Sequence, residues 1–544
     1  MLDSIFFPKS LIWLKFVLFL SMIFSVQLAF GASCHIVQRG EASDADKALL
    51  AADVSRAELL YRDALKTMPN EVKLQTGLVH SLLRQKKLQE ASDAANVALA
   101  AAPQEASLIA LRGEVEYRQG MPWSAGKSAE EARKLDPCDV RAILLSARLA
   151  RLASMFATSN RLIRDAHQLD PQDPEIRIEW IGTLPLKERA LELDAYLHQS
   201  NGKTEDELRE MRLAADHWKK LLNEPHKSCH LVSSVRATET PFIRPYSDSS
   251  ERRKFYLEVQ FNNRSTHLEI DTGSTGLVVT QEAAERAGLK AFSQAEMSGF
   301  GDEGHRTAYT AFADSVRIGK LEFQDCAVEV LSDKYMPSNA DGVIGMDVFS
   351  DFLVTLDFPT RKLTLAPLPP LPGESTRDAP ELMAHEASSD EKDHASEPHD
   401  RYVAPEMKDY TRVYRIGHNL ILPASLNDQK ISLFILDTGA WSTMIAPEAA
   451  REVTKVRNDY DVALRGISGS VNKVYSADSV TFRFANLSQK TTGILSIDMS
   501  KLSQEVGMEI SGLLGATTLK QLTMHIDYRD GLVKFDYDPK HGYY

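Results

Sequence analysis

Two segments of the chain repeat one order of features, and this duplication constrains the fold more than any other feature. The first, LEIDTGSTGLVV at 268–279, places Asp271-Thr-Gly between two apolar runs. The second, LFILDTGAWSTMI at 433–445, does the same with Asp437-Thr-Gly, and the two aspartates lie 166 positions apart. A single Asp-Thr-Gly is a common turn sequence, so the triplets alone assign no function.

The surroundings of the two triplets also match. An apolar-apolar-Gly segment follows each aspartate, 74 positions later in the first copy and 78 in the second. A strand-like run with an aspartate comes 12 positions after that glycine in both copies. These residues are Gly345 and Asp357 in the first copy, and Gly515 and Asp527 in the second. The shared order and spacing predict two duplicated lobes.

From about residue 252 onward, apolar and polar residues alternate in runs such as KFYLEVQF and LTLAPL, with glycines between the runs. A period of two is typical of strands, so this region is predicted to be all-β. The pattern stops at 371–405, which is polar, charged and Pro-bearing. Such a composition predicts a disordered linker, and its three histidines are interpreted as solvated rather than as a metal site. The lobes are therefore predicted at 250–370 and 406–544.

Strand, Asp-Thr-Gly, strand, Gly-rich turn and apolar-apolar-Gly together resemble one lobe of an aspartic peptidase. The length of each copy is more similar to the retroviral type, retropepsin, than to the larger pepsin lobe. The resemblance implies a polypeptide substrate, no cofactor or metal, and a catalytic pair, Asp271 and Asp437, that activates one water. Like charges so close share a proton. One carboxylate then takes a proton from water while the other protonates the scissile carbonyl.

The same resemblance implies roles for the residues that follow each aspartate. The threonines would hydrogen-bond across the lobe interface, and the glycines would leave room at the centre and support the carboxylates through their backbone N–H groups. In the first lobe the serine could hydrogen-bond its aspartate, whereas the alanine of the second cannot, so the lobes would be unequal. These supporting residues are Thr272, Gly273, Ser274, Thr438, Gly439 and Ala440.

A glycine-rich turn lies between the triplet and the apolar-apolar-Gly segment in each copy, in SGFGDEG and GISGS. Such turns are candidates for flaps that cover an extended substrate and exclude water. One candidate in each lobe would make the protein more similar to the retroviral dimer than to pepsin. The flap candidates are Gly299, Phe300 and Gly301 in the first lobe, and Ile467, Ser468 and Gly469 in the second.

Ahead of the β region, a proline recurs every 34 positions, at Pro69, Pro103, Pro137 and Pro171. Small residues precede each proline by 5 and 12 positions, where two helices would pack closely, and the proline would end the second helix. The small residues are Ala57, Ala64, Ala91, Ala98, Ala125, Ala132, Ser159 and Ala166.

This pattern resembles the tetratricopeptide repeat. It predicts a stacked helical solenoid with capping helices at 41–225, which implies a protein or peptide ligand. The predicted fold is therefore multidomain: an all-α tetratricopeptide-like solenoid followed by a mainly-β, two-lobed aspartic-peptidase fold.

The first residues are predicted to be a signal peptide at 1–32, because Lys9 and Lys15 precede an apolar run at 16–30 and small residues follow it. The chain would then be exported, to the periplasm or outside the cell, with no membrane span after removal of this segment. The alternatives are an uncleaved N-terminal membrane anchor and a lipid anchor, since GASC before Cys34 is faintly similar to a lipoprotein cleavage site.

The net charge bears on the kind of partner, and the cysteines bear on disulfides and metal binding. The formal net charge of −13 argues against a nucleic-acid partner. The four cysteines, Cys34, Cys138, Cys229 and Cys326, allow three pairings in an exported protein, and their spacing matches no zinc motif.

Two functions follow from these predictions. The first is an exported aspartic endopeptidase with a helical-repeat arm that recruits proteins. The second is a non-catalytic protein-binding scaffold, or lobes that act only by pairing between chains.

Overall fold

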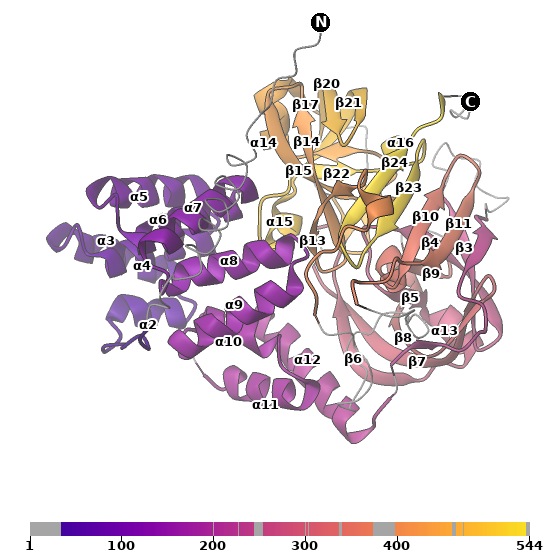
Figure 1. Ribbon diagram of the computed structural model, residues 1–544, viewed down its shortest axis with the longest axis horizontal. Helices are drawn as coiled ribbons and strands as arrows, with labels where there is room; N and C mark the ends of the chain where they lie inside the picture. The colour runs from indigo at the N-terminus through magenta and orange to yellow at the C-terminus, as the bar shows by residue number, and fades with distance from the viewer. Residues whose placement is uncertain are drawn as a thin grey trace, which may run out of the picture.

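The computed structural model describes residues 34–199, 201–226, 228–243, 254–299, 301–302, 304–336, 340–373, 398–459, 464–471 and 473–539. The predicted signal peptide at 1–32, the flap candidate Phe300 and most of the predicted linker lie outside these residues. Helices form the first part of the chain and strands the second (Figure 1). The predicted fold class, an all-α region followed by a mainly-β two-lobed region, is confirmed.

Helices of 13 or 14 residues alternate through most of the first region. Those that begin at Val54, Leu88, Pro122 and Phe156 start 34 positions apart, as do their partners. The helices are α2 (Asp44–Leu50), α3 (Val54–Thr67), α4 (Val72–Arg84), α5 (Leu88–Ala101), α6 (Ala106–Arg118), α7 (Pro122–Leu135), α8 (Val140–Leu152), α9 (Phe156–Leu169), α10 (Pro174–Ile181), α11 (Leu186–Leu197) and α12 (Glu205–Asn223). We call this region the helical arm.

Close helix packing explains the small residues of the 34-residue pattern. Seven of the eight are at most 1% exposed, because they lie where neighbouring helices touch; Ala64 is half-buried. The cost of a larger side chain at such a contact is steric overlap with the next helix. The pattern therefore reports helix contacts throughout the arm.

Lobe 1 is built on an eight-stranded sheet of order β1-β8-β5-β9-β4-β3-β7-β6. Its strands are β1 (His230–Leu231), β3 (Tyr256–Phe261), β4 (Arg264–Asp271), β5 (Leu277–Thr280), β6 (Ala291–Met297), β7 (Arg306–Ile318), β8 (Leu321–Leu331) and β9 (Gly342–Gly345). Helix α13 (Gln281–Ala287) follows β5, and the 3-10 turns η1 (Asp333–Tyr335) and η2 (Met346–Phe349) flank β9.

Lobe 2 repeats this arrangement in a sheet of order β13-β14-β15-β22-β16-β21-β20-β17. Its strands are β13 (Tyr414–Ile416), β14 (Asn419–Leu426), β15 (Lys430–Leu436), β16 (Met444–Ile445), β17 (Val456–Asn458), β20 (Val474–Phe484), β21 (Leu487–Ile497) and β22 (Gly512–Leu514). Helices α14 (Pro447–Val453), α15 (Ser500–Val506) and α16 (Ala516–Leu519) and the short hairpin β18 (Arg465–Gly466) and β19 (Gly469–Ser470) complete it.

The duplication extends to strand direction. In lobe 1, β9 runs parallel to β4 and antiparallel to β5, and β5 runs parallel to β8. In lobe 2, β22 has the same relation to β15 and β16, and β16 runs parallel to β21. Each strand before an Asp-Thr-Gly is therefore held at the centre of its sheet by the apolar-apolar-Gly strand.

A six-stranded sheet joins the lobes, with the order β12-β24-β23-β10-β11-β2. Lobe 1 supplies the hairpin β10 (Phe352–Asp357) and β11 (Lys362–Pro367), and lobe 2 supplies β23 (Thr523–Asp527) and β24 (Leu532–Asp536). Strands β2 (Thr238–Pro241) and β12 (Thr411–Arg412) form its edges. The hairpins pair directly through β10 and β23, so the lobes share backbone hydrogen bonds.

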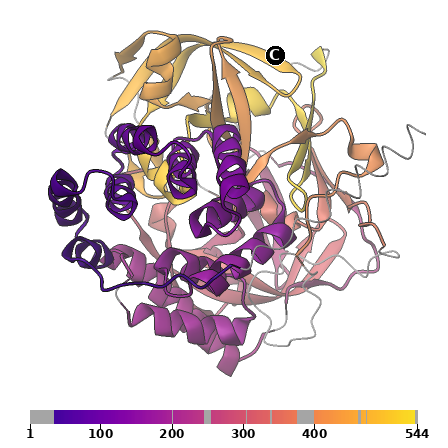
Figure 2. The same cartoon turned by 60° about the vertical axis from the view of Figure 1, so that its left-hand side comes forward.

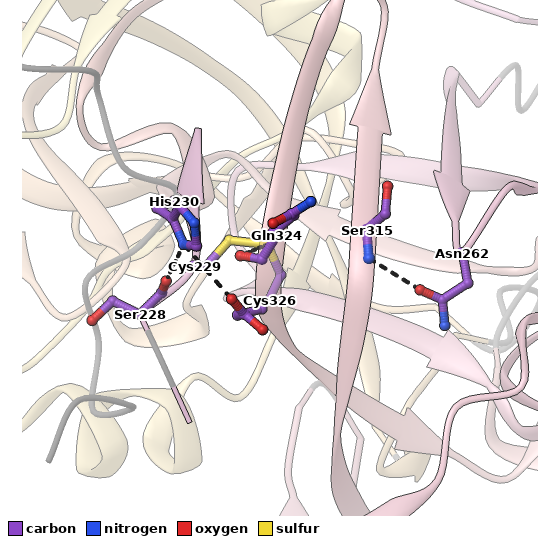
Figure 3. The surroundings of a disulfide bond; sticks show 8 residues. Ser228, Cys229, His230, Asn262, Ser315, Gln324 and Cys326 are labelled. Atoms are coloured by element: carbon purple, nitrogen blue, oxygen red, sulfur yellow. Dashed lines mark hydrogen bonds and ion pairs between the residues drawn. A yellow bond between two sulfur atoms is a disulfide. The ribbon is translucent and has the colours of Figure 1, made fainter. Parts of the chain in front are cut away.

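Two disulfides form, which is one of the three pairing arrangements that the sequence allowed. Cys34 pairs with Cys138 and ties the start of the described chain to the helical arm. Cys229 pairs with Cys326 and holds the short edge strand β1 against β8 (Figure 3).

The helical arm contacts both lobes (Figure 2). The backbone N–H and hydroxyl of Thr158 on α9 donate to Asp400 at 2.9 and 2.6 Å. The carbonyl of Arg118 accepts from the N–H of Glu509 in lobe 2 at 2.8 Å. On the other side, Lys220 of α12 donates to the carbonyl of Phe292 on β6 at 2.6 Å. The arm is therefore fixed to the body of the protein.

The linker prediction at 371–405 was wrong at its end. Residues 398–405 pack against the helical arm and the six-stranded sheet: Asp400 binds Thr158, and the N–H of Tyr402 donates to Asp530 at 2.8 Å. Ala404 is buried with Met407, which lies in the 3-10 turn η3 (Pro405–Met407). The aromatic and aliphatic residues of this short segment give it apolar surface to bury, which the average composition of the linker concealed.

No helix in the described part of the chain is both long and apolar enough to cross a membrane.

Candidate active site

The two Asp-Thr-Gly loops meet between the lobes. Asp271 ends β4 and Asp437 directly follows β15. A Cβ atom added at Gly273 would lie 2.7 Å from the carboxyl carbon of Asp437, and one added at Gly439 would overlap the Asp271 carboxylate. Each glycine therefore lies against the carboxylate of the opposite lobe, where a side chain has no room. The structure brings both predicted aspartates to one place.

Thr272 and Thr438 join the two loops by reciprocal hydrogen bonds. The backbone N–H of each donates to the hydroxyl oxygen of the other at 3.0 Å. Each hydroxyl then donates across the interface, to the carbonyl of Leu436 at 2.9 Å and that of Ile270 at 3.1 Å. Both threonines are buried. Four hydrogen bonds, shielded from water by burial, therefore hold the two loops together.

Backbone amides support both carboxylates, but not in the same way. The N–H of Gly273 donates to Asp271 at 2.8 Å, and the N–H of Ala440 donates to Asp437 at 2.8 Å. Within the described residues, the Ser274 hydroxyl makes no hydrogen bond to Asp271, contrary to the role suggested by the resemblance. The donating amide lies two residues beyond Asp271 in lobe 1 and three residues beyond Asp437 in lobe 2, so the two loops differ in backbone geometry.

The electrostatics of the pair follow from burial and proximity. Burial raises the pKa of Asp271 well above its ordinary value, and the charges of Asp437 and Glu269 raise it further. Burial also raises the pKa of Asp437, but the Ala440 amide and a hydrogen bond from Asp271 oppose that rise. Both pKa values are raised, so the buried pair keeps a shared proton to higher pH than two exposed carboxyl groups would.

The predicted flap segments of the two lobes lie against each other. The N–H of Gly299 donates to the hydroxyl of Ser468 at 3.1 Å, and the guanidinium of Arg306 donates to the carbonyl of Ile467 at 3.2 Å. Gly301 has φ +123°, and a Cβ there would lie 2.5 Å from the Ser468 backbone. Only glycine fits both the conformation and the space.

Two further residues near the aspartates were missed by the sequence analysis. The first is Asp347, which lies two positions after Gly345. Its carboxylate accepts from the hydroxyl of Thr275 at 2.9 Å and from the N–H of Gly276 at 3.0 Å. His418, in the turn between β13 and β14, lies close to the backbone of Gly273. Burial lowers its pKa, against the opposing charge of Asp347. The position of Asp347 beside the apolar-apolar-Gly segment could have marked it in the sequence as a residue near the site. No sequence pattern marks His418.

Among the described residues, no group of three or more His, Cys, Asp or Glu side chains is placed to bind a metal ion. A large cavity of about 2090 Å³ lies elsewhere, between the helical arm and lobe 2. It is lined by helix residues such as His80, Glu114 and Arg141, and by Gln504 and Glu509 of lobe 2.

Comparison with known proteins locates the similarity in lobe 1. Residues 257–348, which include Asp271, match the family described as aspartyl protease. No curated protein sequence matches the chain. Among solved structures, the aspartic proteinase from Irpex lacteus aligns with 56% of this chain and 98% of its own, at 13% identity and a TM-score of 0.33.

Proposed function

We propose that the chain is an aspartic endopeptidase in which Asp271 and Asp437 activate one water within a single chain. The observation that carries the proposal is the meeting of the two carboxylates, each against the glycine of the opposite loop, above the reciprocal Thr272–Thr438 hydrogen bonds. The aspartyl-protease match of lobe 1 supports the same reaction class.

The geometry supports a division of roles. The ionised member of the pair takes a proton from the water, and the protonated member donates its proton to the scissile carbonyl. Their proximity and burial keep one proton on the pair. The paired flaps would exclude bulk water from the reaction.

Asp271→Asn and Asp437→Asn test the proposal against an unfolded protein substrate between pH 3 and 7. Each substitution should reduce cleavage at least 100-fold, because general acid–base catalysis contributes about 10²–10⁴. Asp357→Asn, a half-buried aspartate of β10, is the matched control and should retain cleavage. Cleavage that survives both active-site substitutions would overturn the proposal.

The alternative that lobes pair between chains makes a different prediction. If each site combined lobe 1 of one chain with lobe 2 of another, a mixture of the Asp271→Asn and Asp437→Asn proteins would regain activity in sites that contain neither substitution. The six-stranded sheet supports pairing within one chain, because β10 and β23 share five residue pairs. No recovery is expected on mixing, and a monomer is expected by light scattering.

For the helical arm we propose binding of a polypeptide segment, as in tetratricopeptide proteins. The cavity of about 2090 Å³ supports this, since pockets for small ligands span about 300–1,000 Å³. A photoreactive side chain at Gln504, inside the cavity, should crosslink to added unfolded protein. One at Val97, which is exposed on α5 and does not line the cavity, should not. Equal crosslinking from both positions would count against the arm as a binding site.

Export is proposed from the apolar run at 16–30 and is supported by the two disulfides, which form in oxidising compartments. The intact mass of protein recovered outside the cytoplasm should correspond to a chain that lacks residues 1–32. An intact mass that includes them would favour the membrane-anchor alternative, and an added lipid mass at Cys34 would favour the lipid anchor.

A further inference from the structure

The two sheets place four residues of each lobe in matching rows beside the catalytic loops. In lobe 1 the strand registers align Glu269 with Val343, Val343 with Val278, and Val278 with Glu329. Directly paired residues point to the same face of a sheet. In lobe 2 the same registers align Ile435, Leu513, Met444 and Leu495. The row is wholly apolar in lobe 2 and ends in a glutamate on each side in lobe 1.

This row lies on the substrate side of lobe 1. Asp271 is two residues beyond Glu269 on β4, and residues two apart on a strand share a face. The tip of the opposite flap, Ile467, packs on the same face against a cluster that contains Val278 and Val343. The Glu269 end of the row therefore lies beside Asp271, and the middle of the row lies beneath a flap. Glu329 stands at the other end, three strands or about 14 Å from Glu269, within the length of a polypeptide bound across this face.

The two glutamates of the row differ in their partners. Glu269 forms an ion pair with Lys254 at 2.6 Å. Glu329 has no cationic partner in the described chain: one carboxylate oxygen accepts from the Thr310 hydroxyl at 2.8 Å, and the other is buried without a hydrogen bond. Burial raises the pKa of Glu329. An unpaired buried carboxylate oxygen is costly to retain, which points to a partner that arrives with the substrate.

We propose that Glu329 is a specificity-determining residue that binds the ammonium or guanidinium group of a lysine or arginine side chain in the substrate. At the equivalent place in lobe 2, Leu495 with Met444 and Leu513 takes an apolar side chain. The inference rests on the proposed function and names its substrate class: polypeptides with a basic residue on one side of the cleaved bond and an apolar residue on the other. A substrate with an apolar residue at the position of the lysine or arginine would leave the Glu329 carboxylate unpaired, so its cleavage should be disfavoured.

The test uses the full chain and octapeptides that differ only by lysine or norleucine at one position on either side of the cleaved bond. Lysine should be preferred over norleucine at one position by about 10- to 100-fold in kcat/KM. Glu329→Leu should abolish that preference, and Glu329→Gln, which retains the Thr310 hydrogen bond, should weaken it. Glu258→Leu, an exposed carboxylate on β3 of the same sheet, is the matched control. An unchanged preference in Glu329→Leu would overturn the inference.

A binding measurement separates this inference from the proposed function. Peptides of the same sequences with a reduced, uncleavable bond are titrated into the Asp437→Asn protein, with and without Glu329→Leu. Tighter binding of the lysine peptide that depends on Glu329 supports the cation site even if no peptide is ever cleaved. Equal binding of both peptides refutes the site, even if cleavage depends on Asp271 and Asp437.

Discussion

Thr272 and Thr438 exchange hydrogen bonds of 3.0 Å, each from the backbone N–H of one to the hydroxyl of the other. Both bonds cross from one lobe to the other, so they help to join the two lobes. Because each threonine directly follows one of the two aspartates, disturbance of the threonines should reach the aspartates directly.

Thr272→Ala removes one acceptor for Thr438 and one donor to Leu436, and leaves both backbone groups buried without partners. The free energy of unfolding should fall by about 2–4 kcal/mol, and cleavage should fall with it. Thr272→Ser should restore both. Thr266→Ala, which loses one hydrogen bond within lobe 1, serves as the control: urea denaturation should show a smaller loss, with cleavage retained.

The pH dependence of the catalytic pair follows from its raised pKa values. Cleavage requires one proton on the pair, so it should decline as pH rises through the raised pKa of Asp271. The sign for stability is the same: raised values favour the folded state at low pH, and this contribution is lost as pH rises. Asp271→Asn should therefore raise the melting temperature at pH 7, by about 2–4 °C per kcal/mol of repulsion relieved, and have little effect at pH 3. A scanning calorimetry series provides the measurement, and a lower melting temperature at pH 7 contradicts the prediction.

Asp527 on β23 should make stability depend on pH near neutrality. Burial and the neighbouring charge of Asp530 raise its pKa to about 7, and one of its oxygens is buried without a partner. Its stabilising contribution is present at acid pH and is lost as pH rises through about 7. Asp527→Asn keeps an acceptor for the N–H of Asp530 and should flatten the fall in urea midpoint between about pH 4 and 7, the interval between its ordinary and its raised pKa.

The duplication supplies a control for this experiment. Asp357 occupies the matching position on β10 of lobe 1 but is half-buried, with a carboxylate that accepts from the N–H of Thr360 at the surface. Asp357→Asn makes the same chemical change without removal of a buried charge, so its pH profile should follow the wild type. Parallel flattening in both variants would exclude Asp527 as the cause.

Gly301→Ala tests the paired flaps. The substitution adds a Cβ that overlaps the Ser468 backbone at a residue with φ +123°, so the flap tips must separate. We expect a rise in KM and about a 10-fold loss of kcat/KM, in line with the effect of small misplacements near a site. Gly304→Ala shares the left-handed backbone, φ +85°, but meets nothing within 4 Å. Hydrogen exchange at the flaps should increase in the first variant only.

The sequence predicted best where a short local pattern carried the structure. Alternating residues, the 34-position spacing of prolines and the matched surroundings of the triplets each describe one element and its nearest neighbours. The position of Asp271 at the end of β4 follows from this kind of pattern.

Contacts between distant segments were beyond such patterns. His418 reaches Gly273 only because two lobes fold together, and nothing in a Gly-His turn indicates this. Ser274 was assigned by analogy a hydrogen bond to Asp271 that is not found among the described residues, whereas the support expected from the Gly273 amide is present. The acidic residue Glu329 became noticeable only when strand registers placed it opposite Val278 and matched it with Leu495.

The six-stranded sheet also sets the order in which the protein can be made. The hairpin β10–β11 ends at Pro367, but its partner strand begins at Thr523. A ribosome that adds about 5–20 residues per second needs roughly 8–30 s to cover that interval. Throughout it, the edge of β10 offers unpaired N–H and C=O groups to any strand nearby. Synthesis of this protein therefore includes a period of exposure to aggregation, which ends only when the last strands emerge.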